Sequence, residues 1–146
     1  MDVTAELEAP VPAATLFAAV EDLDQYPAWL DIVPRADRVE VGSDEGGPAW
    51  SVDLRGRVGP LARSKRLRMV RTVHEPGIHI RFERAELDGH QHSPWVLDAA
   101  VAATAGGSRL TMGLHYGGGL FGPVMERILG EEIERSKPRL LALLAT

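Results

Sequence analysis

The sequence predicts an α+β domain in which a curved, seven-stranded antiparallel sheet wraps around one long C-terminal helix. Apolar residues alternate with polar ones through most of residues 35–117, which is the period of strands, and recur at helical spacing after them. The connections between the alternating segments are short and contain Gly or Pro, which favours hairpins over crossovers. With 146 residues and neither a linker nor a repeat, the chain fits a single domain, 1–146.

The N-terminal part predicts one strand and two short helices. Apolar and polar residues alternate over 3–9, so this segment has one face to bury. Pro12 suits the first turn of a helix, because the N–H that proline lacks is unpaired there anyway. Helical spacing then predicts a helix over 13–22 and a second over about 23–33, which Pro34 ends. The two short helices therefore lie between the first and second strands.

Six further strands and a long helix complete the prediction. The strands are expected at 36–43, 48–58, 62–74, 78–86, 92–104 and 108–117. Pro123 opens the helix, which runs to about Ala145 and carries an apolar stripe that has to cover the sheet. Gly130 would remove a side chain over the sheet and widen the space there. Gly130 and Pro138 both lower the helix propensity, so we expect the helix to bend and to act as the lid of a pocket.

Composition excludes several classes of function. The absence of Cys excludes disulfides, thiolate metal sites and cysteine nucleophiles. No apolar run is long enough to span a bilayer and the acidic N-terminus is unlike a signal peptide, so we expect a cytoplasmic protein. The net charge of −5 argues against nucleic-acid binding. No motif indicates a cofactor, and neither a serine triad nor a pair of clustered carboxylates is predicted.

Basic residues concentrate in one part of the chain, since residues 46–74 contain seven bases and one acid. Four of these bases share the outward parity of two neighbouring strands: Arg55, Arg57, Arg66 and Arg68. Like charges opposite each other destabilise a sheet, so they need compensation. One interpretation is a solvated outer face paired with acids of adjacent strands. The other is transient contact with an anionic membrane surface.

Two N-terminal segments carry a family resemblance. They read Val11-Pro-Ala-Ala-Thr-Leu-Phe-Ala-Ala-Val20 and Glu21-Asp-Leu-Asp-Gln-Tyr-Pro-Ala-Trp-Leu30, the second with a Y-P-x-W motif. Together with the order of elements, they resemble the START-like (SRPBCC) superfamily, which includes Bet v 1-type and polyketide cyclase/dehydrase-like proteins. The resemblance covers essentially the whole chain. It implies the helix-grip fold and the binding of a hydrophobic small molecule, such as a lipid or a polyketide-like compound, in a cavity between sheet and helix. Some relatives catalyse cyclisation or dehydration there.

The parity of each strand indicates which side chains face the helix. We expect the inward-facing set, with side chains from the helices, to line the cavity: Trp29, Trp50, Leu54, Lys65, Leu67, Met69, Ile80, Phe82, Arg84, Trp95, Leu97, Met112, Leu114, Tyr116, Phe121, Met125 and Leu129. The same aromatic, aliphatic and thioether side chains would also fill an ordinary core, and the sequence leaves that alternative open.

Polar residues at the ends of strands mark one end of the predicted cavity as its mouth. The residues near this end are Lys65, Arg84, Glu86, Trp95 and Tyr116. Alternate connections of a meander share an end of the sheet, so the turns 43–48, 75–77 and 105–107 are expected together at the opposite end. If the protein is an enzyme, Arg84 would stabilise an enolate oxygen and Tyr116 would donate or shuttle a proton.

The last features to consider are two histidines that could bind a metal, and the functions that the sequence as a whole allows. His90 and His92 have a spacing compatible with a transition metal, but no third ligand is predictable and the alternative is a polar loop, so no metal is predicted. Three hypotheses for the function follow: a carrier or sensor of an apolar molecule, with a carbonyl- or carboxylate-bearing one among the alternatives; a polyketide aromatase/cyclase or dehydratase; and a protein-interaction module. Either a monomer or a homodimer is compatible with each.

Overall fold

The computed structural model describes residues 2–58, 61–117 and 124–146. Its elements follow the chain in the order β1 (Asp2–Ala9), α1 (Ala13–Ala18), η1 (Leu23–Ala28), β2 (Arg35–Val39), β3 (Ala49–Val58), β4 (Leu61–Glu75), β5 (His79–Arg84), β6 (Trp95–Thr104), β7 (Gly107–Tyr116) and α2 (Val124–Leu144). The seven strands form one antiparallel sheet in the order β1-β7-β6-β5-β4-β3-β2. The predicted start of the last helix at Pro123 lies outside the described residues.

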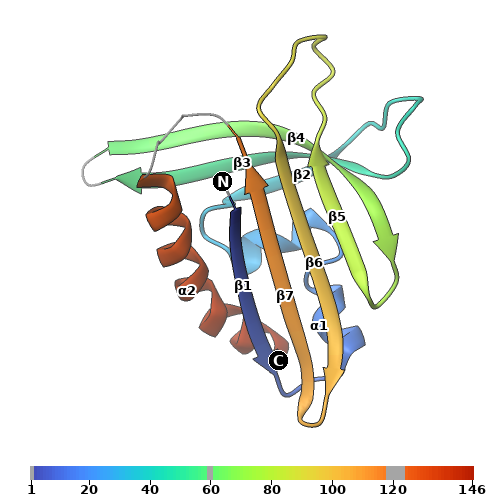
Figure 1. Cartoon of the computed structure of the whole chain (residues 1–146), viewed down its shortest axis with the longest axis vertical. Coiled ribbons are helices and arrows are strands. Elements are labelled where there is room, and N and C mark those ends of the chain that lie inside the picture. Colours follow the sequence, from blue (N-terminus) through green and yellow to red (C-terminus); the bar gives the residue numbers. More distant parts are fainter. Residues whose placement is uncertain (1, 59–60, 118–123) are drawn as a thin grey trace.

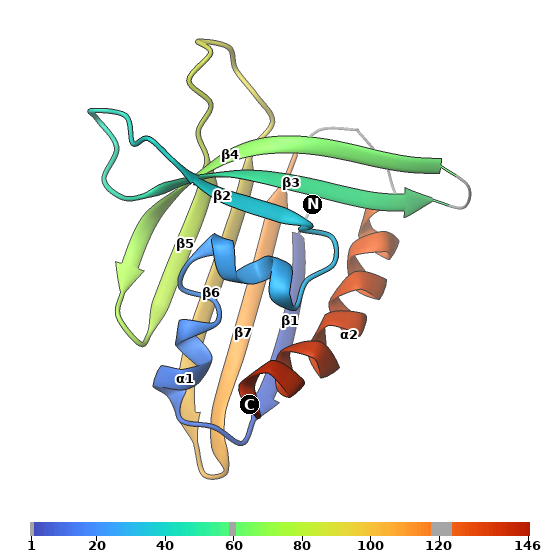
Figure 2. The ribbon, with the colours of Figure 1, turned by 180° about the vertical axis from the view of Figure 1, so that it is seen from behind.

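The sheet curls so that its two ends approach each other, and α2 lies across the opening (Figure 1). α2 contacts β1 at one end of the sheet and β3 near the other, while α1 and η1 lie on the concave side (Figure 2). The predicted α+β fold, with a helix gripped by a seven-stranded sheet and two short helices after the first strand, is therefore confirmed. Within the described ranges, no helix is long and apolar enough to cross a membrane.

Both short helices stop before their predicted ends, and the second is a 3₁₀ helix. The carbonyls of Ala19 and Val20, just after α1, accept hydrogen bonds from Trp29 Nε1 (3.3 Å) and from the Tyr26 hydroxyl (3.0 Å). These side-chain bonds replace the next turn of helix. Pro27 lies inside η1 and cannot donate a backbone hydrogen bond, which favours a short, tight helix over a longer one.

The long strand β4 is divided between its two neighbours. Its residues 61–70 pair with β3, whereas residues 69–75 pair with β5. β3 and β5 therefore overlap on β4 at only two positions, and the loop before β3 meets the loop after β5 near the middle of β4. The expectation that 43–48 and 75–77 share one end of the sheet is wrong, because it assumed neighbouring strands of equal extent.

The helix α2 continues through Pro138 to Leu144, and Figure 2 shows its C-terminal turns changing direction. Pro138 is exposed, so its ring lies on the solvent side of the helix. Gly130 is also exposed, and a Cβ added there would meet nothing within 4 Å. The expectation that Gly130 widens the space over the sheet is therefore wrong, since this position faces away from the sheet.

An aromatic cluster fills one part of the concave side, beneath η1. Tyr26 packs edge-on against Phe82 (ring centroids 6.3 Å apart), and Phe82 packs edge-on against Trp50 (5.5 Å). All three side chains are fully buried, as is that of Ile80. Packed aromatic rings leave no room for a ligand, so any cavity must lie further along the sheet, towards α2.

Candidate functional site

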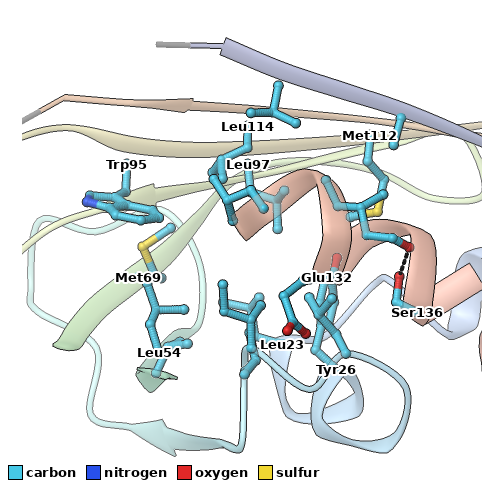
Figure 3. Close-up of a pocket in the computed structure, with 18 of the residues that line it drawn as sticks. Leu23, Tyr26, Leu54, Met69, Trp95, Leu97, Met112, Leu114, Glu132 and Ser136 are labelled. Carbon is cyan, nitrogen blue, oxygen red and sulfur yellow. Dashed lines mark hydrogen bonds between the residues drawn. The ribbon is translucent and has the colours of Figure 1, made fainter. Parts of the chain in front are cut away.

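An apolar cavity of about 140 Å³ lies between the concave face of the sheet, η1 with the loop after it, and α2. Figure 3 shows its walls: Leu97, Met112 and Leu114 reach in from β6 and β7, and Met69 and Leu54 face them from β4 and β3. The side chains come from strands far apart in the sheet order because the sheet curls. The cavity thus exists where α2 bridges the two ends of the sheet.

The structure places nine of the predicted lining residues in the wall of this cavity. They are Trp29, Leu54, Leu67, Met69, Trp95, Leu97, Met112, Leu114 and Leu129. Eight other predicted residues are not found there. Trp50, Ile80 and Phe82 belong to the packed core under η1, Lys65, Arg84 and Tyr116 lie elsewhere on the sheet, and Phe121 and the side chain of Met125 lie outside the described residues. Parity identified the correct face of each strand but not the position along it.

The sequence reading missed the remaining lining residues. They are Val3, Ala5, Leu23, Tyr26, Leu30, Ile32, Val33, Val52, Gly113, Glu132, Ile133 and Ser136. Glu132 and Ser136 are spaced four residues apart on α2 and share a face with Leu129 and Ile133, so helical spacing alone would have included them. Their polar character led to their omission.

Few polar atoms reach the cavity. One carboxylate oxygen of Glu132, Oε1, is bonded to Arg135, while the other, Oε2, is buried and has no hydrogen-bond partner in the described part of the chain. The Ser136 hydroxyl donates to the Ile133 carbonyl (2.7 Å) and the Tyr26 hydroxyl to the Val20 carbonyl. Burial raises the pKa of Tyr26 well above its usual range, and Asp22 adds to this effect, so the phenol stays protonated. Figure 3 shows the Glu132 carboxylate among the apolar lining side chains.

The predicted mouth residues form two clusters. Arg84 Nε donates to Glu86 Oε1 (3.2 Å), its Nη1 donates to the Ser93 carbonyl (3.3 Å), and only 8% of its side chain is exposed. Lys65 lies close by: burial lowers its pKa first, and the charge of Arg84 lowers it further. These bonds hold the Arg84 guanidinium in place, and Arg84 is not among the residues that line the cavity.

Trp95 and Tyr116 form the second cluster, with stacked rings whose centroids are 5.2 Å apart. Trp95 lines the cavity and Tyr116 lies behind it, nearly fully buried. Burial raises the pKa of Tyr116, and the charge of Glu126 contributes in the same direction. The phenol is therefore a poor acid in this position.

The predicted basic group divides into exposed and buried members. Arg66 pairs with Asp53 (2.8 Å) and leaves 72% of its side chain exposed, and Arg55 is exposed as well. The expectation of an accessible outward-facing Arg68 is wrong. Only 12% of this side chain is exposed, because it forms an ion pair with Glu45. The side chain of Arg57 lies outside the described residues.

Of the two loop histidines, His92 is held by other side chains, whereas among the described residues only the backbone amide of His90 makes a hydrogen bond, to Asp88. His92 Nε2 lies 2.8 Å from Asp88 Oδ2, and His92 Nδ1 lies 3.3 Å from Arg84 Nη2. His90 is exposed. In the ranges that the structure covers, no three His, Asp or Glu side chains are grouped as metal ligands would be.

Comparison with known proteins gives one family and several similar structures. Residues 1–144 match the family described as polyketide cyclase / dehydrase and lipid transport. None of the curated proteins matches the chain. A START superfamily protein from Mycobacterium smegmatis is 16% identical with a TM-score of 0.72, over 99% of this chain and 97% of that one. TTHA0849 from Thermus thermophilus is 18% identical with a TM-score of 0.70, over 98% and 99%.

A third similar structure is the di-domain ARO/CYC StfQ from the steffimycin biosynthetic pathway. It is 16% identical with a TM-score of 0.64, and the match covers 98% of this chain but 48% of that one. At such identities the structures share a fold, whereas the family match rests on the sequence itself. The chain belongs to the family described as polyketide cyclase / dehydrase and lipid transport.

Proposed function

We propose that this protein binds a hydrophobic small molecule in the cavity between the sheet and α2, as a carrier or a sensor. The observation that carries the proposal is the cavity itself, which has almost wholly apolar walls and lies next to a packed hydrophobic core. Unfilled apolar space costs stability, because the lining atoms lose contacts that a packed core would give them. A ligand that fills it recovers those contacts. The family description, which includes lipid transport, supports the same proposal.

The size of the cavity limits what it holds in this conformation. A volume of about 140 Å³ is close to that of an engineered cavity of about 150 Å³ that takes up benzene. A one-ring molecule therefore fits without rearrangement. A longer lipid or a polyketide requires more of the roughly 300–1,000 Å³ typical of ligand pockets. The wall expected to move is α2, whose main contacts within the described residues are with β1 and β3.

The second candidate is a polyketide aromatase/cyclase or dehydratase acting in the same cavity. It is supported by the family description and by the likeness to StfQ, whose printed description is ARO/CYC. A cyclase needs a donor that polarises a substrate carbonyl and a group that moves a proton. Arg84 and Tyr116, the residues expected in these roles, do not line the cavity, so the geometry favours binding over catalysis.

Native mass spectrometry of freshly purified protein tests the proposal, because a co-purified ligand adds a discrete mass. The matched pair of variants is Leu97→Trp, which fills the cavity, and Val96→Trp, which places the same side chain on the opposite face of the same strand. We expect Val96→Trp to keep the ligand, or an added apolar probe such as toluene, and Leu97→Trp to lose it. Equal binding by both variants, or no binding by the wild type, would refute the proposal.

To test catalysis, Arg84→Ala and Tyr116→Phe are compared with the wild type for turnover of a polyketide-like substrate and for binding of the apolar probe. An enzyme of the expected type loses turnover in both variants and keeps probe binding. A carrier shows no turnover in any form of the protein.

A further inference from the structure

One polar atom that lines the cavity, Oε2 of Glu132, is surrounded by apolar side chains. Glu132 Oε2 is buried without a hydrogen-bond partner among the residues described, although a lone buried carboxylate oxygen costs free energy until a donor reaches it. The Glu132 side chain is only 16% exposed, and it lines the cavity from α2. Its other oxygen is bonded to Arg135, whose side chain is 63% exposed at the surface. Glu132 thus connects the solvent side of α2 with the inside of the cavity.

Among the described residues, the end of the cavity formed by α2 and η1 offers acceptors and no free donor. The hydroxyl protons of Ser136 and Tyr26 are both committed to backbone carbonyls, so the oxygens of these side chains can only accept further hydrogen bonds. Trp95 Nε1 is another buried atom without a partner in the described residues, but Figure 3 shows this nitrogen on the side of its ring that is turned away from Glu132. A ligand group that meets Glu132 must therefore bring its own proton.

We propose that Glu132 makes the cavity selective for a compact apolar ligand that carries a neutral hydroxyl group, and that it excludes carboxylates. This inference rests on the proposed function and names its ligand class. A hydroxyl donates one hydrogen bond to Oε2 and leaves the rest of the molecule to the apolar wall. A carboxylate would place like charges side by side.

An ammonium group is less suitable than a hydroxyl. The charge of Glu132 is already compensated by Arg135 on the surface side. An ammonium group would lose its hydration shell on entering the apolar cavity. In return it would interact only with a carboxylate that is already paired with Arg135. The neutral donor avoids this desolvation cost.

The test measures the binding of four one-ring probes by ligand-observed NMR at pH 7: phenol, toluene, benzylamine and benzoate. Phenol and toluene have nearly the same shape, so their ratio isolates the hydroxyl. We expect wild-type protein to bind phenol about tenfold more tightly than toluene or better, the usual advantage of a hydrogen bond to a charged group. Benzylamine should bind more weakly than phenol, and benzoate should not bind.

The decisive variant is Glu132→Leu, with Glu131→Leu as the matched control. Glu131 is the neighbouring carboxylate on α2, and 62% of its side chain is exposed. In Glu132→Leu the preference for phenol should disappear while toluene still binds, and in Glu131→Leu the wild-type ratio should persist. Leucine suits the apolar surroundings of position 132, so this variant is expected to fold, which a thermal melt verifies.

The outcomes separate this inference from the proposed function. If toluene binds but phenol has no advantage, or if Glu132→Leu keeps that advantage, the inference is overturned and apolar binding stands. Tighter binding of benzylamine than of phenol overturns the choice of a neutral donor. If no probe binds the wild type, the proposed function and this inference fall together.

Discussion

Arg68 and Glu45 form a two-pronged ion pair in which each Nη atom of the guanidinium lies 2.6 Å from a carboxylate oxygen. The same guanidinium donates to the carbonyls of Ala85 (2.9 Å) and Glu40 (2.8 Å). Arg68 therefore ties the loop before β3 and the loop after β5 to the middle of β4. Its exposed fraction of 12% protects these bonds from solvent.

We predict that Arg68→Ala lowers the free energy of unfolding by about 2–3 kcal/mol, because it leaves the Glu45 carboxylate and two carbonyls without their donor. Urea denaturation measures the change. The control is Arg66→Ala on the same strand, whose partner Asp53 lies at the surface, and this variant should leave stability nearly unchanged. Similar losses in both variants would contradict a special role for Arg68.

Stability should fall in acid partly through Glu45. The hydrogen bond from Arg68 holds the pKa of Glu45 below its ordinary 4.5, and the Gly42 amide and the charge of Arg68 act in the same direction. A carboxyl whose pKa is lowered by folding stabilises the protein above its unfolded pKa, and this contribution is lost as the pH falls through the folded pKa.

The comparison is wild type against Glu45→Gln, with the free energy of unfolding measured by urea from pH 7 to pH 3. We expect the wild type to be the more stable protein at pH 7. The difference should shrink below about pH 4.5, where protonation removes the charge that glutamine lacks. A difference that is constant across this range would show that the charge of Glu45 does not contribute.

Glu132→Leu is predicted to raise the free energy of unfolding by about 1 kcal/mol, since it removes a buried oxygen that has no partner among the described residues. The ion pair with Arg135 that it breaks is largely exposed on the arginine side and contributes little. Thermal and urea denaturation measure the effect, with Glu131→Leu as reference. A clear loss of stability would mean that Oε2 is satisfied in the native protein.

Two adjacent glycines should respond in opposite ways to alanine. A Cβ on Gly47 would lie 2.2 Å from the Arg71 carbonyl, so the backbone must shift, and Gly47→Ala should cost about 1–3 kcal/mol. A Cβ on Gly46 meets nothing within 4 Å, and Gly46→Ala should be neutral or stabilise by up to about 1 kcal/mol. Chemical denaturation of the two variants measures both. Equal effects would contradict the close approach of this loop to β4.

The fold could be predicted from sequence because each of its determinants is local. Alternation defines the strands, Gly and Pro define the turns, and parity placed Leu54, Leu97 and Met112 on the face where the cavity lies. Parity does not say how far along its strand a residue meets another element. Trp50 and Phe82 have the correct parity, yet Tyr26 packs with Phe82 from η1 and closes that part of the sheet.

The polar residues of the site could not be predicted from the sequence for a different reason. Glu132 has helical spacing with Leu129, but a glutamate is assigned to solvent unless its surroundings are known. The burial of Arg68 depends on the division of β4 between two neighbours, and strand extents of this kind follow from tertiary packing. Sequence patterns thus identified part of the apolar wall, whereas its other members and its polar groups are known only from the structure.

Met69 is one of the two residues of β4 that pair with both β3 and β5, and it also lines the cavity. A ligand in contact with the Met69 thioether would therefore contact the position at which the β3-paired and β5-paired parts of β4 meet. Linkage is reciprocal, so occupancy of the cavity and cohesion of that junction must reinforce or weaken one another by the same free energy. Substitutions in the loops that Arg68 holds, although distant from a bound ligand, would then increase the rate at which that ligand dissociates.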